Sequence, residues 1–253
     1  MLLRRVIDHV KAQNWTAVAL DFIIVVVGVF IGIQVSNWNA ARGERSAERR
    51  ALELLLAEAE NNVAYSELTI YRAGLLQTDR EAAMARLQGR EPEAGDPISG
   101  IAHMDRYRDM TPIHAAYDEL SASGDLTLIR SADIRGALAL YNGVVIFHDR
   151  RRREYMERTP DIFDLASPYM EVEYDPELRL GHNTQIDWTA AGEDRNLVNA
   201  INRVMGDQLA FNERRTIILD HARILCDALA EELGKSCAPP DWVGAEIRGE
   251  PIQ

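Results

Sequence analysis

The sequence is poor in cysteine, lysine and aromatic residues. It has two cysteines, two lysines (Lys11 and Lys235) and 7% aromatic residues in 253 positions. Two cysteines are too few for a small disulfide-rich scaffold, and we attribute the scarcity of lysine to genome composition. The net charge of −12 argues against a general nucleic-acid binder, because such proteins carry basic patches. We therefore expect no nucleic-acid partner.

The sequence also lacks the motifs that mark common catalytic sites. It contains no G-x-x-x-x-G-K-[ST] phosphate loop, no G-x-S-x-G elbow, no H-E-x-x-H and no C-x-x-C. Its six histidines are scattered without the spacing of metal ligands, at His9, His103, His114, His148, His182 and His221. We therefore predict neither an enzyme nor a cofactor or metal site.

Two charged stretches have a simpler interpretation than a ligand site. The segment His148–Arg158 contains four consecutive arginines, which spread around a helix and have Asp149, Glu154 and Glu157 close enough for pairing. The acidic residues within 171–177 lack the central glycine and the spacing of a calcium-binding EF-hand loop. We interpret both stretches as solvated surface.

One apolar run stands out near the N-terminus. Phe22–Ile33 is uninterrupted, and its extension to Thr16–Val35 has about 20 residues, enough to cross a bilayer. Trp15 and Trp38 flank the run about 35 Å apart, the spacing of the two interfacial aromatic belts. A buried core helix and a cleaved signal peptide are the alternatives, although no A-x-A cleavage pattern follows the run. We predict a transmembrane helix over residues 15–38, after an N-terminal flank (1–14) that is either interfacial or frayed.

Three residues of this run share one helix face. Gly28 and Gly32 form a G-x-x-x-G pattern, which allows a second helix to approach closely. Asp21 lies seven residues before Gly28 and falls on nearly the same side. An intramembrane acid is a candidate for function by default, although Asp21 is also near enough to Trp15 to reach the headgroups. We expect Asp21, Gly28 and Gly32 to form an association face between helices.

After the run, the pattern predicts a bundle domain over residues 39–237. Between Ala40 and Gln88 there is no proline, and apolar positions recur with an average period of 3.5. These positions are Leu52, Leu56, Ala59, Val63, Ser66, Ile70 and Ala73. Charged residues such as Glu58 and Arg80 lie off this stripe. Gly89 suits the residue after a helix end, so the fold class is all-α, with one transmembrane helix continuing into long antiparallel helices.

Local signals divide the rest of the bundle into shorter elements. Thr111-Pro112 predicts the start of a helix over 114–121, and Ser131 caps a helix that ends before Thr159-Pro160. Residues 169–174 alternate like a strand, which in a helical chain we interpret as an extended loop. Residues 194–233 predict one long helix or two joined helices ended by Gly234.

The two cysteines flank the end of that last helix. Cys226 and Cys237 are eleven residues apart, and a chain reversal at Gly234 would bring them within bridging distance. A disulfide is expected only if the bundle is outside the cytoplasm. The tail (238–253) contains three prolines and is expected to pack loosely.

Two stretches resemble a known family. They contain Asp21, Gly28, Gln34, Asn37, Trp38 and Asn39, and then Leu120, Ser123, Gly124, Leu126, Leu128 and Ile129. This order is similar to an uncharacterised bacterial domain-of-unknown-function family of small single-span membrane proteins, with a Gln-x-x-Asn-Trp-Asn exit and a Leu-x-x-Ser-Gly-x-Leu-x-Leu-Ile turn. The resemblance implies a membrane-anchored helical body and implies no activity.

We therefore expect a non-enzymatic, membrane-anchored interaction or scaffold protein. Its partners would be the lipid bilayer and either another protein or a second copy of the chain. The alternative is an extracytoplasmic sensor-like domain that binds a small ligand and signals through a partner. The charges flanking the run are nearly balanced, with three Lys/Arg before it and four after it within about 15 residues. We favour the bacterial inner membrane, with the helical domain in the periplasm.

Overall fold

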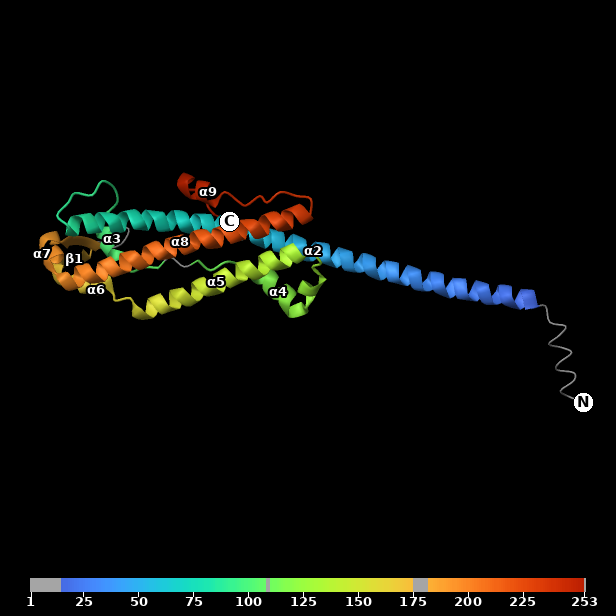
Figure 1. The fold of residues 1–253 in the computed structure, drawn as a ribbon. Helices are drawn as coiled ribbons and strands as arrows, with labels where there is room; N and C mark the ends of the chain where they lie inside the picture. The colour runs from blue at the N-terminus through green and yellow to red at the C-terminus, as the bar shows by residue number, and fades with distance from the viewer. Residues whose placement is uncertain (1–14, 108–109, 175–181, 253) are drawn as a thin grey trace, which may run out of the picture. The chain divides into compact units, whose positions relative to one another are not determined.

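The computed structural model describes residues 15–107, 110–174 and 182–252, and it divides into two compact units, Met1–Arg50 and Ala51–Gln253. Figure 1 shows the elements. The helices are α2 (Trp15–Leu87), α3 (Pro97–Ala102), α4 (Ala115–Ser123), α5 (Ala132–Arg158), α6 (Ile162–Ala166), α7 (Trp188–Glu193), α8 (Arg195–Glu232) and α9 (Trp242–Arg248). Two short 3-10 turns, η1 (Asp125–Leu128) and η2 (Ser167–Tyr169), and two strands, β1 (Met170–Tyr174) and β2 (His182–Ile186), complete them. The predicted all-α bundle is confirmed.

The second unit is built on three long helices. Leu138 of α5 lies with Leu225 of α8, while Tyr155, further along α5, is bonded to Gln208, earlier in α8. These two helices are therefore antiparallel and side by side (Figure 1). The part of α2 after Arg50 runs parallel to α5, because the chain returns between them as an extended segment rather than as a helix. This segment links α3 to α4.

The predicted apolar stripe of α2 is confirmed. Its members from Leu52 to Ala73 are buried, except Ile70, which is half-buried against the core. The stripe joins α4, α5 and the C-terminal half of α8 in a first apolar cluster, whose centre includes Val63, Ile134 and Leu229. A second apolar cluster joins the end of α2, α3, α6, α7 and the first half of α8. The average spacing of 3.5 residues between apolar positions therefore identified the face of α2 that packs against the other helices.

Most of the predicted helix ends are confirmed. Ser131 accepts the Ile134 N–H and caps α5, which ends at Arg158 before Thr159. Gly89 and Gly234 adopt positive φ angles of 70° and 66° just after α2 and α8. Only glycine takes this conformation at little cost.

The helix predicted over 114–121 is present as α4, but its predicted cap at Thr111-Pro112 is wrong. α4 begins at Ala115 with His114 at the N-cap, and no side chain of its own segment caps it. The carboxylate of Glu58 on α2 instead accepts the N–H groups of Ala116 (2.6 Å) and Tyr117 (3.4 Å). A cap supplied by another helix leaves no local signal in the sequence.

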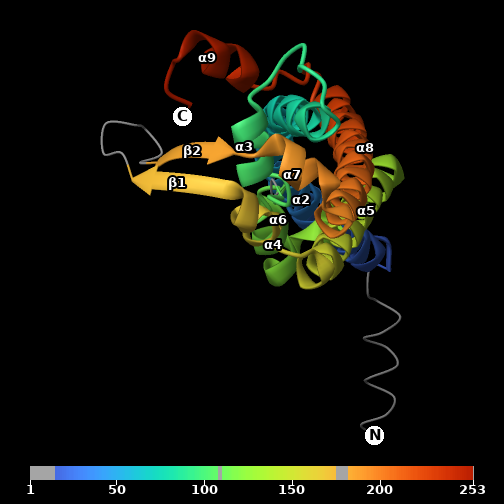
Figure 2. The ribbon, with the colours of Figure 1, turned by 90° about the vertical axis from the view of Figure 1, so that its left-hand side faces the viewer.

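The interpretation of residues 169–174 as a loop is also wrong. β1 pairs with β2 in an antiparallel hairpin, in which Val172 lies opposite Thr184. The partner strand, His182–Ile186, reads HNTQI and has little apolar alternation, so the sequence did not indicate it. The hairpin extends away from the helices in Figure 2.

Two glycines of the bundle are expected to respond in opposite ways to alanine. A Cβ on Gly100 would lie 2.1 Å from the Asp79 carbonyl oxygen, where α3 packs on α2, whereas a Cβ on the exposed Gly143 of α5 meets nothing within 4 Å. Gly100→Ala should therefore lower the free energy of unfolding by about 2 kcal/mol through overpacking. Gly143→Ala should raise it by up to about 1 kcal/mol through helix propensity. Urea unfolding of the full chain in mild detergent measures both, and a destabilising Gly143→Ala would contradict an open outer face of α5.

Candidate functional site

The N-terminal part of α2 is apolar and uncovered. Among the described residues, α2 is the one helix long and apolar enough to cross a membrane, and none of its apolar window is buried. Large apolar side chains from Leu20 to Val35 are 47–69% exposed. By length and composition this helix is able either to span a membrane or to serve as a signal sequence.

The predicted association face is exposed on this helix. Asp21, Gly28 and Gly32 lie within one helical arc by their spacing, and a Cβ added to either glycine meets nothing within 4 Å. Bare backbone is therefore presented on the side that also carries the acid.

Of the two predicted interface anchors, the structure describes the side chain of one. Trp38 is 61% exposed, and the guanidinium of Arg42 lies 5.7 Å from the centre of its ring. The side chain of Trp15 falls outside the described residues. A tryptophan with a cation one turn further along the helix suits the boundary between hydrocarbon and water.

In the second unit, a polar layer separates the two apolar clusters. Residues 103–106, which follow α3, lie beside the long helices, and the buried carbonyl of Met104 needs a protein donor there. Arg80, 2% exposed, donates to the carbonyls of His103, Met104 and Arg106 over 2.7–3.2 Å. The predicted placement of Arg80 off the buried stripe thus did not make it a surface residue.

Two further buried side chains complete this arrangement. The Tyr155 hydroxyl donates to the Asp105 carbonyl over 3.1 Å and accepts a hydrogen bond from Gln208 Nε2 over 3.0 Å. Gln208, which is fully buried, also donates to the Arg106 carbonyl over 3.4 Å. Four consecutive carbonyls, from residue 103 to residue 106, are therefore held by side chains of α2, α5 and α8.

Aromatic contacts fill the rest of the layer. The ring of Tyr107 packs edge-on against Phe211, with 4.8 Å between centroids, and the Arg215 guanidinium lies 4.8 Å from its centre. The Tyr107 hydroxyl shares a hydrogen bond with His148 Nε2. His148 is 2% exposed, so the interpretation of the segment His148–Arg158 as solvated surface is wrong for its first residue.

Burial sets the protonation of this layer. It lowers the pKa of Arg80 to about 10 and raises the pKa of Tyr155. Arg80 therefore stays charged and Tyr155 stays neutral near pH 7. Neither residue is poised to exchange a proton there, and the chemistry they supply is hydrogen bonding to the buried backbone.

The free energy of unfolding of the bundle is expected to depend on pH through Glu58. Burial of its carboxyl group raises its pKa, and the two N–H groups of α4 oppose that rise. A folded-state pKa above the unfolded value means that neutral Glu58 favours folding, and that this contribution is lost as the pH rises. Glu58→Gln should therefore gain stability over the wild type between about pH 4 and about pH 8, by no more than about 1 kcal/mol for a half-buried group.

Urea unfolding at several pH values measures this difference. Glu213→Gln is the matched control, because Glu213 is exposed on α8. If the difference in free energy of unfolding between Glu58→Gln and the wild type becomes smaller with rising pH, the α4 cap, rather than desolvation, dominates the energetics of Glu58.

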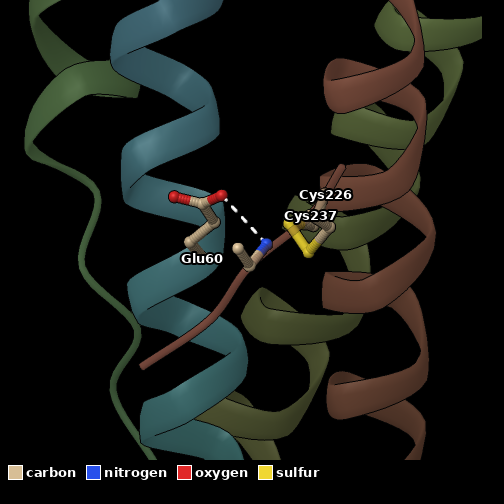
Figure 3. Close-up of a disulfide and its surroundings, with 4 residues drawn as sticks. Glu60, Cys226 and Cys237 are labelled. Carbon is tan, nitrogen blue, oxygen red and sulfur yellow. Dashed lines mark hydrogen bonds between the residues drawn. A yellow bond between two sulfur atoms is a disulfide. The ribbon is translucent and has the colours of Figure 1, made fainter. Parts of the chain in front are cut away.

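The two cysteines form a disulfide in the structure (Figure 3). Cys226 is fully buried in α8, and its Cα lies 5.6 Å from that of Cys237. The Ala238 N–H, next to the disulfide, donates to Glu60 of α2 over 3.0 Å. Further along the tail, Glu246 of α9 forms a two-bonded ion pair with Arg72 of α2, at 2.6 and 2.9 Å. The tail is thus held against α2 by two contacts, one at Ala238 and one at Glu246.

The arginine run is largely a salt-bridged surface, as predicted. Arg152 and Arg153 both pair with Asp149, at 2.9 and 3.1 Å, and Arg151 pairs with Glu154 at 2.6 Å. Within the described part of the chain, no three His, Cys, Asp or Glu side chains gather as a metal site would require.

The polar layer and the α4 cap are the features that sequence reasoning missed. Arg80 lies seven residues after Ala73, so the period of the stripe, continued by one heptad, places it on the packed face of α2. A charged residue at such a position is not expected to be buried on the basis of sequence alone. A buried arginine becomes evident only when the segment that supplies its carbonyl acceptors has been placed beside it.

Comparison of the chain with protein-family models, with curated proteins and with solved structures finds no match in any of the three. The family resemblance carried by the exit and turn motifs therefore stays a prediction.

Proposed function

We propose that this protein is a membrane-anchored helical scaffold that acts by binding. In this proposal the apolar part of α2 spans the inner membrane of a bacterium, and the second unit lies in the periplasm. The observation that carries the proposal is the uncovered apolar helix. Twelve large apolar side chains are exposed between Leu20 and Val35, and leaving each in water forgoes about 1.5–3 kcal/mol. That total exceeds the net stability of a typical domain, so a lipid environment is the natural cover.

The second unit supports binding rather than catalysis. Three of its buried or half-buried titratable side chains have structural roles: Arg80 bonds backbone carbonyls, Glu58 caps α4 and His148 is bonded to Tyr107. The disulfide supports the periplasmic side, because disulfides persist in oxidising compartments. The resemblance to single-span bacterial proteins points the same way.

A sensor-like function is the second candidate, and one feature favours it. An open cleft of about 640 Å³ lies at the base of the hairpin, lined by Glu171, Gln185 and Asp187 among others. The enclosed space between α2, α4, α5 and α8, in contrast, has about 10 Å³, room for one water and for no organic ligand. The space between these four helices therefore holds no ligand, whereas the cleft beside the hairpin has room for one.

The association face provides the test. Membranes that contain the full chain are washed with carbonate, and the retained protein is then chemically crosslinked. We expect retention of the intact chain, and a dimer whose yield drops roughly fivefold in the double variant Gly28→Ile and Gly32→Ile, the equivalent of about 1 kcal/mol in helix pairing.

The double variant Val26→Ala and Phe30→Ala is the matched control, because both residues lie on the opposite side of the helix. Its dimer yield should be unchanged. Release of the protein by carbonate would overturn the anchor, and an equal loss of dimer in the control would overturn the assigned face.

A further inference from the structure

The β-hairpin has one edge that no described element covers. The Asp187 N–H donates to the Tyr169 carbonyl over 2.9 Å. Because bonded and non-bonded pairs alternate along an antiparallel ladder, the backbone groups of Met170 and Val172 point away from β2. The N–H of Met170 is bonded to Ser167, so the open groups are the Met170 carbonyl and both groups of Val172. Figure 2 shows this side of β1 facing away from the helices.

The hairpin is also amphipathic. Met170, Val172 and Ile186 lie on one face, and Val172 is 48% exposed there. Glu171 and Glu173 lie on the other face, and both are exposed. Two strands alone are marginally stable in water, and a third strand or a packed helix is normally needed. Beyond its base, which packs on the second apolar cluster, this hairpin has neither among the described residues.

We propose that the outer edge of β1 binds an extended segment of a partner protein in which basic and apolar residues alternate. Such a segment adds a third strand through the open groups of Met170 and Val172. Its apolar side chains extend the face of Val172, and its basic side chains lie beside Glu171 and Glu173. This inference names the kind of partner for the proposed scaffold and rests on that function.

The cleft at the base of the hairpin suits the same occupant. It is lined by Glu171 on the strand and by Asp187 at the start of α7, and its volume of about 640 Å³ exceeds that of one long side chain. A lysine or arginine entering from the edge strand would meet carboxylate on both sides. The cleft therefore adds a pocket for one basic side chain to the backbone pairing.

The negative charge of the hairpin disfavours pairing with the hairpin of a second copy of the chain. A second copy of the hairpin would place its own Glu171 and Glu173 beside those of the first, and like charges on facing strands destabilise a sheet. The net charge of −12 adds to that repulsion. The edge is thus protected from self-pairing while it stays open to a basic strand.

The test uses the full chain in detergent micelles and a fluorescent peptide of alternating lysine and valine. A peptide with the same residues in two blocks is the control for charge alone. We expect fluorescence anisotropy to give at least about tenfold tighter binding for the alternating peptide. Equal binding of the two peptides would reduce the interaction to non-specific attraction and would overturn the proposal.

Two matched pairs of variants locate the edge. Val172→Pro removes an outward N–H of β1, and Thr184→Pro removes the corresponding one directly opposite on β2. The double variant Glu171→Lys and Glu173→Lys reverses the acidic face without changing the backbone, and Glu213→Lys with Asp220→Lys makes the same charge change on exposed positions of α8. We expect about tenfold weaker binding in the first of each pair and less than about twofold change in the second.

Equal losses within either pair would overturn the assignment to β1. Retention in carbonate-washed membranes and the yield of the crosslinked dimer are measured on the same variants. Neither should change, because both depend on α2 and not on the hairpin. If the alternating peptide fails to bind while these two readouts persist, the edge inference falls and the scaffold proposal stands.

Discussion

Arg80→Met is expected to lower the free energy of unfolding of the bundle by about 3 kcal/mol. The substitution keeps much of the volume but removes the donors of the carbonyls of residues 103, 104 and 106. The buried Met104 carbonyl then loses its donor, while the carbonyl of Arg106 keeps Gln208 and that of His103 keeps the Arg106 N–H. A buried group left without a partner costs about 1–3 kcal/mol, and the weakened bonds to the other two carbonyls add to that loss. Urea unfolding of the full chain in mild detergent, followed by near-ultraviolet circular dichroism, measures the change.

Arg72→Met is the matched control for this result. Arg72 lies on the same helix and bonds Glu246, but its side chain is 33% exposed, and such ion pairs contribute at most about 1 kcal/mol. Arg80→Lys should give an intermediate loss, because one ammonium group cannot serve all the carbonyls that the guanidinium does. A loss below about 1 kcal/mol for Arg80→Met would contradict the role of Arg80 as the main donor of the layer.

Removal of the disulfide is expected to have an effect of similar size. Cys237→Ala should lower the free energy of unfolding by about 3 kcal/mol, the entropy of closing a loop of this length. Cys226 remains buried in α8 and behaves there as a small apolar residue, so the change reports the crosslink itself. The same unfolding measurement applies, and a reductant should have no effect on the variant.

The scarcity of lysine provides a direct assay for this bond. Lys235 lies between the two cysteines, its side chain is 49% exposed, and the only other lysine is Lys11. A lysine-specific protease should therefore cut after Lys235, yet the fragment 236–253 should stay attached until a reductant is added. In Cys237→Ala the fragment should separate at once.

The same bond reports the side of the membrane. If the bundle is periplasmic, thiols trapped by acid and alkylated directly from cells should be fully oxidised. Free thiols in that experiment would place the bundle in the cytoplasm and would contradict the presence of the disulfide in the cell.

Patterns that act within one segment were readable from the sequence. Gly89, Gly234 and Ser131 mark helix ends through their own backbone preferences, and the stripe of α2 reports its packed face through its period. Each of these signals depends on residues a few positions apart. The corresponding predictions are confirmed, as is the all-α class.

Features that depend on distant partners were not readable. The start of α4 is set by Glu58 and by Asn62, which exchanges two hydrogen bonds with the backbone of Ile113, 51 residues away. β1 depends on pairing with a strand of low apolar content. At α4 the local signal was overridden by a contact that only the folded chain creates. At β1 the local alternation was correct, but the partner strand that makes it part of a sheet was not evident in the sequence. The association face of Asp21, Gly28 and Gly32 stays a prediction, since no contact among the described residues tests it.

The polar layer has a consequence for how the bundle is able to move. A slide of α2 by one helical turn, about 5.4 Å, that brings Ala83 opposite the buried carbonyls would carry Arg80 away from them, toward the first apolar cluster. That displacement leaves both the charge and the carbonyls unpaired at once, which costs several kcal/mol. The layer therefore fixes the position of α2 along the other long helices and opposes a slide of α2 parallel to its own axis. The bundle is therefore expected to be rigid along its length, so that the distance between its α4 end and its hairpin end stays constant.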